Sequence, residues 1–208
     1  MSVAEAAAAV GVELQEHDVL RLRELTRLLQ EWNARFNLTA IRDQEGIELK
    51  HVVDSLVASA HGWRSCDGQV PASLLDVGSG AGFPALPLAI VYPQVRVSAL
   101  EASRKKCDFI GMAAAHLGLD VRVVHGRAET EGRLPVLRER FDLVVARSVA
   151  YLPVLAEYCL PFVRPGGRFI AMKSVGLEEE ISDGIAAVEE LGGNLREPMP
   201  YQIAGLEG

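Results

Sequence analysis

The stretch Asp76-Val-Gly-Ser-Gly-Ala-Gly-Phe-Pro84 follows a short apolar run and precedes a helical pattern. Its glycines Gly78, Gly80 and Gly82 provide backbone that can take up positive φ and approach a ligand closely. The spacing differs from the G-x-G-x-x-G of dinucleotide sites, because Phe83 stands where the last glycine would be. We predict a ligand-binding turn, with an anionic group at the start of the following helix. A tight turn without a ligand would use the same glycines.

Short β-type runs alternate with helical patterns on both sides of this turn. The β-type runs are Ser73–Val77, Arg96–Leu100, Val121–His125, Phe141–Ala146 and Arg168–Lys173. The helical patterns are Phe83–Tyr92, Ser103–Leu117, Leu152–Phe162 and Glu178–Leu191. Such alternation is typical of a parallel sheet with helices on both faces. The chain is therefore predicted to be α/β and Rossmann-like, with a mostly parallel twisted sheet.

Two further helical patterns precede this alternation. Apolar residues fall at helical spacing over Asp18–Asn33 and again over Ile47–Ala60. The stretch between them, Asn33–Arg42, is too polar and irregular for a helix or a strand. Trp63–Pro71 contains Gly, Ser, Asp and Pro, which predicts a linker. We expect a helical N-terminal extension over residues 1–65 and a Rossmann-like domain over residues 66–208.

The net charge of −7 is distributed unevenly along the chain. Residues 177–208 hold eight acidic residues and one basic residue, so the remainder carries equal numbers of each and RNA is not excluded. No run approaches the roughly 18 apolar residues of a membrane span. Three cysteines without C-x-x-C spacing predict neither a disulfide framework nor a metal site. We expect a cytoplasmic protein without a secretory signal.

Ligands of open parallel sheets bind beyond the carboxyl ends of the strands, where the strand order reverses. Glu101 ends the second predicted strand, where a carboxylate accepts hydrogen bonds from ribose hydroxyls. Ala128 and Glu129 follow the third, where their backbone groups can read the edge of an adenine. Arg147 ends the fourth, over the reactive end of a cofactor. The alternatives are a surface role for Glu101 and a structural salt bridge for Arg147.

Five stretches of the chain together resemble one family. They are Asn37-Leu-Thr-Ala-Ile-Arg-Asp43, Lys50-His-Val-Val-Asp-Ser-Leu56, Asp76–Pro84, Ser103-Arg-Lys-Lys106 and Arg147-Ser-Val-Ala150. From about Glu16 to its last residue the chain resembles the ribosomal RNA small-subunit methyltransferase G family, also called glucose-inhibited division protein B. The first two stretches separate this family from methyltransferases at large. The resemblance implies transfer of a methyl group from S-adenosylmethionine to N7 of a guanine in 16S ribosomal RNA.

The resemblance also implies roles for individual residues. Cofactor contacts fall on Gly78, Phe83, Glu101, Ala102, Ser103, Ala128, Glu129 and Arg147. Guanine N7 has a lone pair and no proton, so the transfer requires positioning and no general base. We therefore expect His51, His116 and His125 to be structural or to face RNA. Arg147 is the candidate catalytic residue, either as a donor to guanine O6 or as a clamp on the cofactor.

Basic residues on either side of the glycine turn are candidates for phosphate contacts, although each is also an ordinary surface charge. They are Arg35, Arg42, Lys50, His51, Arg104, Lys105, Lys106, Arg127 and Lys173. Access to N7 requires an exposed base, which favours single-stranded or unfolded RNA. The expected partner is 16S ribosomal RNA or the 30S subunit, bound by a monomer without a metal and without a membrane.

The chain departs from the family pattern at its end. Family members usually continue into a closing β-strand, so we expect the final strand of the fold to be missing here. Two other functions share every cofactor residue named above: a methyltransferase of small molecules or proteins, and a non-catalytic cofactor-binding factor in ribosome assembly. A nicotinamide dehydrogenase is disfavoured by the spacing of the glycines.

Overall fold

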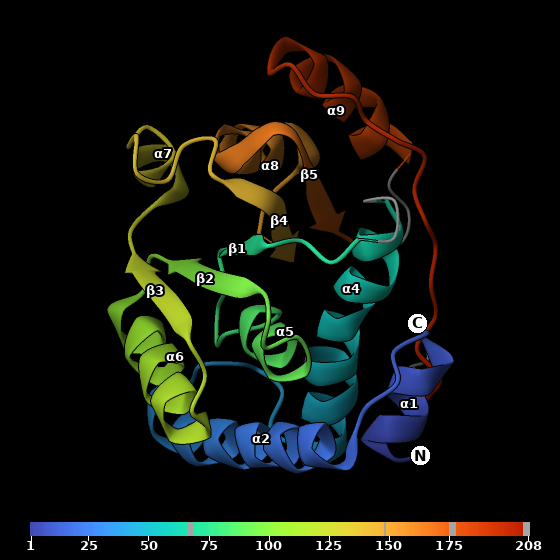
Figure 1. The fold of residues 1–208 in the computed structure, drawn as a ribbon, viewed down its shortest axis with the longest axis vertical. Coiled ribbons are helices and arrows are strands. Elements are labelled where there is room, and N and C mark those ends of the chain that lie inside the picture. Colours follow the sequence, from blue (N-terminus) through green and yellow to red (C-terminus); the bar gives the residue numbers. More distant parts are fainter. Residues whose placement is uncertain (66–68, 148, 175–177, 206–208) are drawn as a thin grey trace.

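The computed structural model describes residues 1–65, 69–147, 149–174 and 178–205, with the backbone alone at residues 61 and 63–65. Its described strands form one sheet in the order β3-β2-β1-β4-β5, and every neighbouring pair is parallel (Figure 1). The strands are β1 (Ser73–Val77), β2 (Arg96–Glu101), β3 (Val121–His125), β4 (Phe141–Arg147) and β5 (Val163–Met172). The predicted α/β class with a parallel sheet is confirmed. The strand order reverses between β1 and β4, where a ligand is expected.

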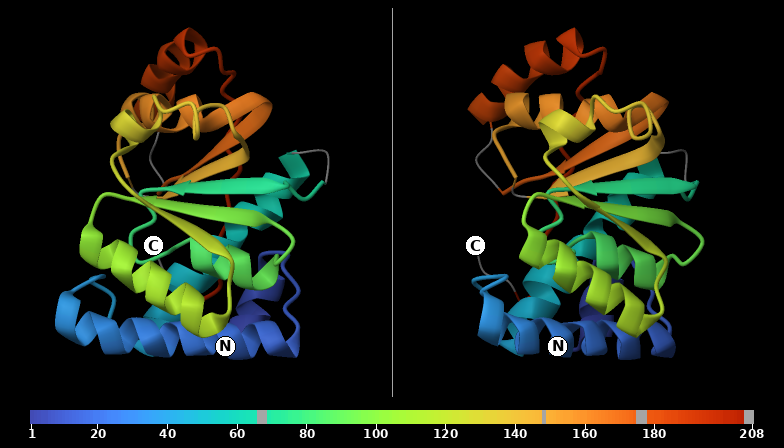
Figure 2. Two further views of the ribbon diagram at one scale, coloured as in Figure 1. Left: turned by 60° about the vertical axis from the view of Figure 1, so that its left-hand side comes forward. Right: turned by 90° about the vertical axis from the view of Figure 1, so that its left-hand side faces the viewer.

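Helices cover both faces of the sheet because successive side chains of each strand point to opposite sides (Figure 2). Leu74 and Val145 pack into one hydrophobic cluster, with the helices α5 (Ala85–Val91) and α6 (Arg104–Leu117). Their strand neighbours pack into a second cluster on the other face. There the covering elements are α8 (Leu152–Cys159), the short η2 (Leu160–Phe162) and, outside α8, the helix α9 (Glu178–Glu190). The short helix α7 (Ala128–Glu131) follows β3.

The N-terminal helices form a further layer on the face of the sheet that α5 and α6 cover. This layer consists of α1 (Val3–Ala9), α2 (Glu16–Phe36), α3 (Gln44–Ile47), the π-helical segment η1 (Glu48–Val53) and α4 (Asp54–Ser65). Helix α2 lies beneath α5 and α6, whereas α4 stands beside α5 and reaches the sheet (Figures 1 and 2). Leu25 and Leu29 of α2 are fully buried in the same cluster as Phe109 of α6. The Trp32 ring packs against the Phe109 ring in a tilted arrangement, with an interplanar angle of 58° and centroids 5.6 Å apart. The layer therefore extends the core of the sheet's first face.

The boundaries of the N-terminal helices differ from those predicted. The second helical stretch begins at Gln44, where the Asp43 carboxylate caps it by accepting from the Gly46 amide at 2.7 Å, and continues through η1 to Ser65. The prediction of a linker from residue 63 is therefore wrong for residues 63–65, and residues 66–68 lie outside the described part. Helix α1 was not predicted; a capping box of Ser2 and Glu5 begins it.

The segment after α9 returns to the N-terminal layer. In Figure 1 it runs from α9 past α4 and ends close to α1. Ile203 is buried in the first cluster, and the Tyr201 hydroxyl donates to Asp54 Oδ1 at 2.7 Å. No strand follows β5 within the described residues. Among the helices of that same part of the chain, none has the length and apolar character needed to cross a bilayer.

Candidate active site at the switch point

The glycine turn follows β1 and is anchored to β2 by backbone hydrogen bonds. The amides of Gly78 and Ser79 both donate to the Leu100 carbonyl, at 2.9 and 3.1 Å, which ties the turn to the end of β2. Gly80 lies at φ +60°, and a Cβ atom added there would meet nothing nearer than 4.0 Å. A Cβ atom at Gly78 would instead come within 2.8 Å of Val149. The turn therefore needs glycine for its shape, and Gly80 presents open backbone.

A buried carboxylate, Asp76, holds the two ends of this turn together. Its Oδ2 accepts from the Ser79 hydroxyl at 2.6 Å and from the Ala85 amide, the first of α5, at 3.0 Å. The side chain is fully buried, and burial raises the pKa of Asp76 to about 6. The Leu86 amide donates to the Gly82 carbonyl at 2.7 Å. The anion site predicted at the start of this helix is thus wrong, because these first-turn amides already have partners inside the protein.

Glu101, at the end of β2, links the glycine turn to the next helix. Its carboxylate is 8% exposed and accepts from the Gly80 amide at 2.9 Å and from the Ser103 amide at 2.7 Å. Each bond uses a different oxygen, so each oxygen keeps one lone pair for a further donor. Glu101 is therefore held rigidly at the edge of the sheet where the sequence predicts the ribose contact.

Arg147 ends β4 and forms the salt bridge that was the alternative interpretation from sequence. One terminal nitrogen donates to Asp54 Oδ2 at 2.8 Å and to the Lys50 carbonyl at 2.9 Å, and the other donates to His51 Nδ1 at 3.2 Å. The Arg147 and Asp54 side chains are 14% and 18% exposed. The guanidinium thus joins the end of β4 to the N-terminal layer.

His51 connects this ion pair to the loop between α2 and α3. Its ring stacks on Phe83 of the glycine turn, with centroids 5.1 Å apart, and its Nε2 lies 2.8 Å from Thr39 Oγ1. Burial, followed by the charge of Arg147, lowers the pKa of His51 to about 4. The imidazole is therefore neutral at physiological pH, with both ring nitrogens in hydrogen bonds.

Buried Asn33 organises the loop that carries Thr39, a role the sequence analysis missed. Its amide oxygen accepts from the backbone N–H groups of Leu38 and Thr39, at 2.7 and 2.9 Å. Its amide nitrogen donates to the carbonyls of Thr39 and Ile41, at 3.0 and 3.4 Å. One signal could have found it: Asn33 lies four residues after Leu29, on the buried stripe of α2, where an unpaired amide would be costly.

These groups surround a pocket of about 330 Å³, which we call the switch-point pocket. It is lined by Leu38, Thr39, Ile41, Lys50, His51, Asp54, Gly78, Ser79, Gly80, Ala81, Phe83 and Arg147. Of the predicted cofactor residues, three line it: Gly78, Phe83 and Arg147. The other five lie outside the lining on the neighbouring strand ends: Glu101, Ala102, Ser103, and Ala128 and Glu129 at the start of α7.

The predicted RNA contacts fall into two groups. Those with exposed side chains are Arg35, Arg42, Lys50, Arg104, Lys105 and Arg127, of which Lys50 also lines the pocket. His51, Lys106 and Lys173 are only partly exposed. The Lys173 ammonium donates to the Ala150 carbonyl at 2.6 Å and pairs with Glu180. Because it has two partners within the protein, it is less available for a phosphate contact.

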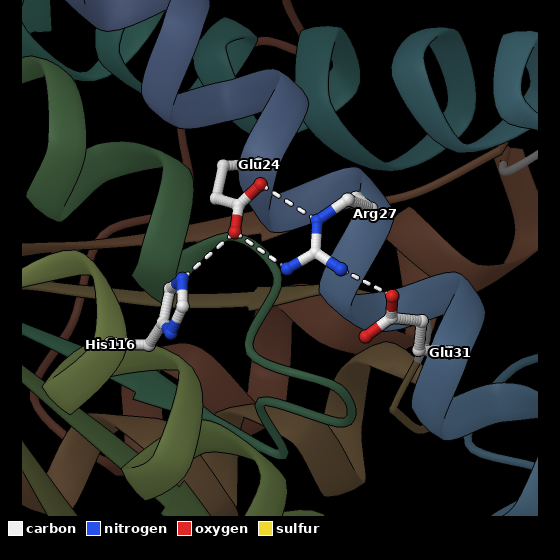
Figure 3. Close-up of polar contacts among 4 residues, drawn as sticks. All are labelled: Glu24, Arg27, Glu31 and His116. Carbon is white, nitrogen blue, oxygen red and sulfur yellow. Dashed lines mark hydrogen bonds and ion pairs between the residues drawn. The ribbon is translucent and has the colours of Figure 1, made fainter.

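The two other histidines singled out from the sequence lie away from the pocket lining. His116 of α6 bonds Glu24 of α2 at 2.8 Å, and Arg27 bridges Glu24 to Glu31 along α2 (Figure 3). His125 Nε2 lies 3.1 Å from the Ala102 carbonyl. Both therefore connect elements of the fold, as expected for structural histidines.

Comparison with known proteins decides the family. The sequence model described as rRNA small subunit methyltransferase G matches residues 19–195. The chain belongs to this family. Within the rRNA small subunit methyltransferase G family, the chain is 45% identical over 203 residues to the protein of that name from Exiguobacterium sibiricum, covering 97% of this chain and 84% of the relative. It is 44% identical over 202 residues to the protein of the same name from Roseiflexus sp., covering 97% of this chain and 84% of the relative.

Solved structures agree with the fold of an rRNA small subunit methyltransferase G. A ribosomal protein L11 methylase from Lactobacillus delbrueckii subsp. bulgaricus matches with a TM-score of 0.53 at 17% identity, covering 74% of both chains. A putative O-methyltransferase from Klebsiella pneumoniae matches with a TM-score of 0.52 at 18% identity, covering 79% of this chain and 77% of that one. At this identity the likeness concerns the fold alone.

Proposed function

We propose that this protein transfers the methyl group of S-adenosylmethionine to N7 of a guanine in 16S ribosomal RNA. The observation that carries the proposal is the composition of the switch-point pocket. One wall is the glycine turn, and the other is formed by Thr39, Lys50 and His51. These three belong to the stretches that distinguish the family from other methyltransferases. The proposal also agrees with the activity in the names of the relatives.

The residues at the strand ends fit S-adenosylmethionine. The open backbone at Gly80 leaves room above the turn, and the Glu101 carboxylate beside it keeps lone pairs for the ribose hydroxyls. Bound S-adenosylmethionine supplies an electrophilic methyl group on its sulfonium. The residues that would hold it are Gly78, Phe83, Glu101, Ala102, Ser103, Ala128, Glu129 and Arg147.

The reaction requires the protein to position the reactants and does not require a general base. Guanine N7 has no proton to lose, and effective orientation alone supplies a large part of the rate. The surroundings of His51 are consistent with the absence of a general base. Its ring is neutral, and both ring nitrogens are hydrogen-bonded, to Arg147 and to Thr39. Asp54 is likewise committed, to Arg147 and Tyr201. Arg147 and His51 therefore shape the wall against which the base is placed.

The RNA is held by positive charge around the pocket. Lys50 at its rim contacts a phosphate next to the target nucleotide. The other exposed cations extend the contact: Arg35, Arg42, Arg104, Lys105 and Arg127. The N-terminal helical extension supplies the substrate wall, and the domain from residue 66 supplies the cofactor wall. A monomer acts on 16S ribosomal RNA, free or in the 30S subunit.

Mass mapping of methylated guanines tests this proposal. Protein-free 16S ribosomal RNA and 30S subunits from a strain without the modification are incubated with the protein and S-adenosylmethionine. We expect one 7-methylguanine in at least one of the two substrates. Methyl transfer only to small molecules or proteins would overturn the proposal, and so would cofactor binding without any transfer, as in a non-catalytic assembly factor.

A further inference from the structure

The hydrogen bonds around His51 fix which of its nitrogens carries the proton. The guanidinium of Arg147 is always protonated and can only donate, so His51 Nδ1, 3.2 Å away, must accept. In the neutral ring the proton then lies on Nε2, which donates to Thr39 Oγ1 at 2.8 Å. The low pKa of His51 agrees with this neutral tautomer. The ion pair of Arg147 and Asp54 thus orients the imidazole as a donor to Thr39.

Toward a ligand, the Thr39 hydroxyl can act only as a hydrogen-bond donor. A hydroxyl oxygen accepts two hydrogen bonds, and that of Thr39 accepts from His51 Nε2 and from the Ile41 amide at 3.2 Å. Its proton has no acceptor among the residues that the structure describes, and Thr39 lines the switch-point pocket. The pocket therefore contains a hydroxyl that is available as a donor and not as an acceptor.

This donor is also held in place on both sides. Asn33 makes four hydrogen bonds to the backbone of the loop from Leu38 to Ile41, so the position of Thr39 is set by a buried side chain. On the other side, the stacking of His51 on Phe83 fixes the imidazole against the glycine turn. A donor placed in this way loses little entropy when it binds a ligand, which is what discrimination between similar bases requires.

We propose that Thr39 selects guanine by donating a hydrogen bond to O6 of the base whose N7 is methylated. This inference rests on the proposed function. N7 and O6 are neighbouring acceptors on one edge of guanine, whereas adenine presents N7 beside an amino donor. An amino group would meet a hydroxyl whose lone pairs are already occupied, so adenine is rejected. In the selection of the base, His51 and Arg147 act through Thr39 and are positioning residues.

A cycle of protein and base substitutions tests the inference. The target guanine in 16S ribosomal RNA is replaced by inosine, which keeps O6, or by 2-aminopurine, which lacks it. For the native protein we expect inosine to retain most of the kcat/KM of guanine. Thr39→Val should lower kcat/KM about tenfold for guanine and inosine, the effect of one hydrogen bond, and leave that for 2-aminopurine unchanged. Thr39→Ser should retain the preference for guanine, which guards against a misfolded valine variant.

Two substitutions of His51 test the positioning role. His51→Phe keeps an aromatic ring against Phe83 and removes the donor to Thr39, so a lone pair of the hydroxyl becomes free. We expect the preference for guanine over adenine at the target position to fall, because the free lone pair can accept from the adenine amino group. His51→Gln, which retains an N–H donor, should restore part of this preference.

The outcomes separate this inference from the proposed function. If Thr39→Val slows transfer to guanine and 2-aminopurine by the same factor, Thr39 does not contact O6 and the inference fails while the proposed function stands. If the native protein methylates no guanine of 16S ribosomal RNA at all, the proposed function fails first.

Discussion

The two walls of the switch-point pocket are built on different principles. The glycine turn is a local structure, in which the Ser79 hydroxyl and the amides of Gly80 and Ala85 bond to the carboxylates of Asp76 and Glu101. The opposite wall, which we call the N-terminal wall, contains Thr39, Lys50 and His51 and is held by Arg147. It is assembled from distant segments, because Asp54 and His51 contact Arg147, more than ninety residues away in sequence. One wall positions a ligand with backbone, and the other with side chains held by other side chains.

This difference predicts which property each wall loses when one of its residues is substituted. The glycine turn depends on the absence of Cβ atoms and on two carboxylates, so single changes should affect ligand binding first. The N-terminal wall depends on one guanidinium that satisfies three acceptors, so its loss leaves several polar groups without partners. Substitutions on this wall should therefore cost stability as well as activity.

The largest effect is expected from Arg147→Ala. Removal of one partner from a largely buried ion pair leaves the Asp54 carboxylate uncompensated, which costs about 3 to 5 kcal/mol. We expect the free energy of unfolding in urea to fall by this amount and the turnover to fall by orders of magnitude. Arg164→Ala is the matched control: its pair with Asp142 involves an arginine that is 49% exposed and should cost at most about 1 kcal/mol. Equal losses in the two variants would contradict the structural role of Arg147.

The fold was predictable because its signals are local. Four strands begin at the expected residue, since each is a short apolar run between a turn and a helix. The exception is β5, which begins at Val163 and not at the predicted Arg168. Its Pro165 and Gly166 indicate a turn, yet Val163 already pairs with Phe141, and the register shifts before Arg168 pairs with Leu143. Pairing over more than twenty residues overrides the local signal here.

Residues of both walls could be named from the sequence, but the contacts that assemble the wall opposite the glycine turn could not. The position of Glu101 follows from a strand that ends at the edge of the sheet, and the structure places its carboxylate against the glycine turn. Nothing local indicates that Thr39 would meet His51, because a π-helical segment and a loop held by Asn33 bring them together. Tyr201 reaches Asp54 across 147 residues of sequence. Contacts of this kind depend on the packing of whole layers.

Opposite pH dependences are expected for the two walls. Asp76 has a pKa raised from 3.8 to about 6, so its contribution to stability is complete below pH 3.8 and is lost as the pH rises through 6. His51 has a pKa lowered from 6.5 to about 4, so its contribution is complete above pH 6.5 and is lost as the pH falls through 4. Each shift corresponds to about 3 kcal/mol, and the two nearly cancel between pH 4 and 6.

Urea unfolding of two variants between pH 4 and 7 separates these contributions. Relative to the native protein, Asp76→Asn should gain stability as the pH rises from 4 to 6, because it lacks the carboxylate that ionises. His51→Gln should lose stability relative to the native protein over the same range, because it lacks the imidazole that deprotonates. Parallel pH profiles of the two variants would show that these groups do not titrate as their surroundings indicate.

Glu101→Gln is expected to have a smaller effect, a loss of about 2 kcal/mol in the free energy of S-adenosylmethionine binding. The amide retains one acceptor oxygen and loses the charge that strengthens hydrogen bonds to ribose hydroxyls. Its NH2 group also replaces an oxygen that accepts from the Gly80 or the Ser103 amide. Calorimetric titration with S-adenosylmethionine should show an affinity lower by one to two orders of magnitude. Glu129→Gln is the control, because only the backbone of Glu129 is proposed to contact the cofactor and its side chain is exposed. Unchanged affinity in Glu101→Gln would remove this carboxylate from the cofactor site.

The smallest effect is expected at the far end of the N-terminal wall, from Tyr201→Phe. Burial and the nearby Asp54 carboxylate raise the pKa of Tyr201, so its hydroxyl stays protonated and donates to Asp54 Oδ1 at 2.7 Å. Loss of this one bond should lower the free energy of unfolding by about 1 kcal/mol, because Arg147 still compensates the carboxylate. Tyr151→Phe removes the same type of bond, to Asp183 at 2.8 Å, from an exposed tyrosine and should change stability much less. If turnover also falls in Tyr201→Phe and not in Tyr151→Phe, the returning C-terminal segment takes part in orienting Arg147; if neither stability nor turnover changes, Asp54 is held by Arg147 alone.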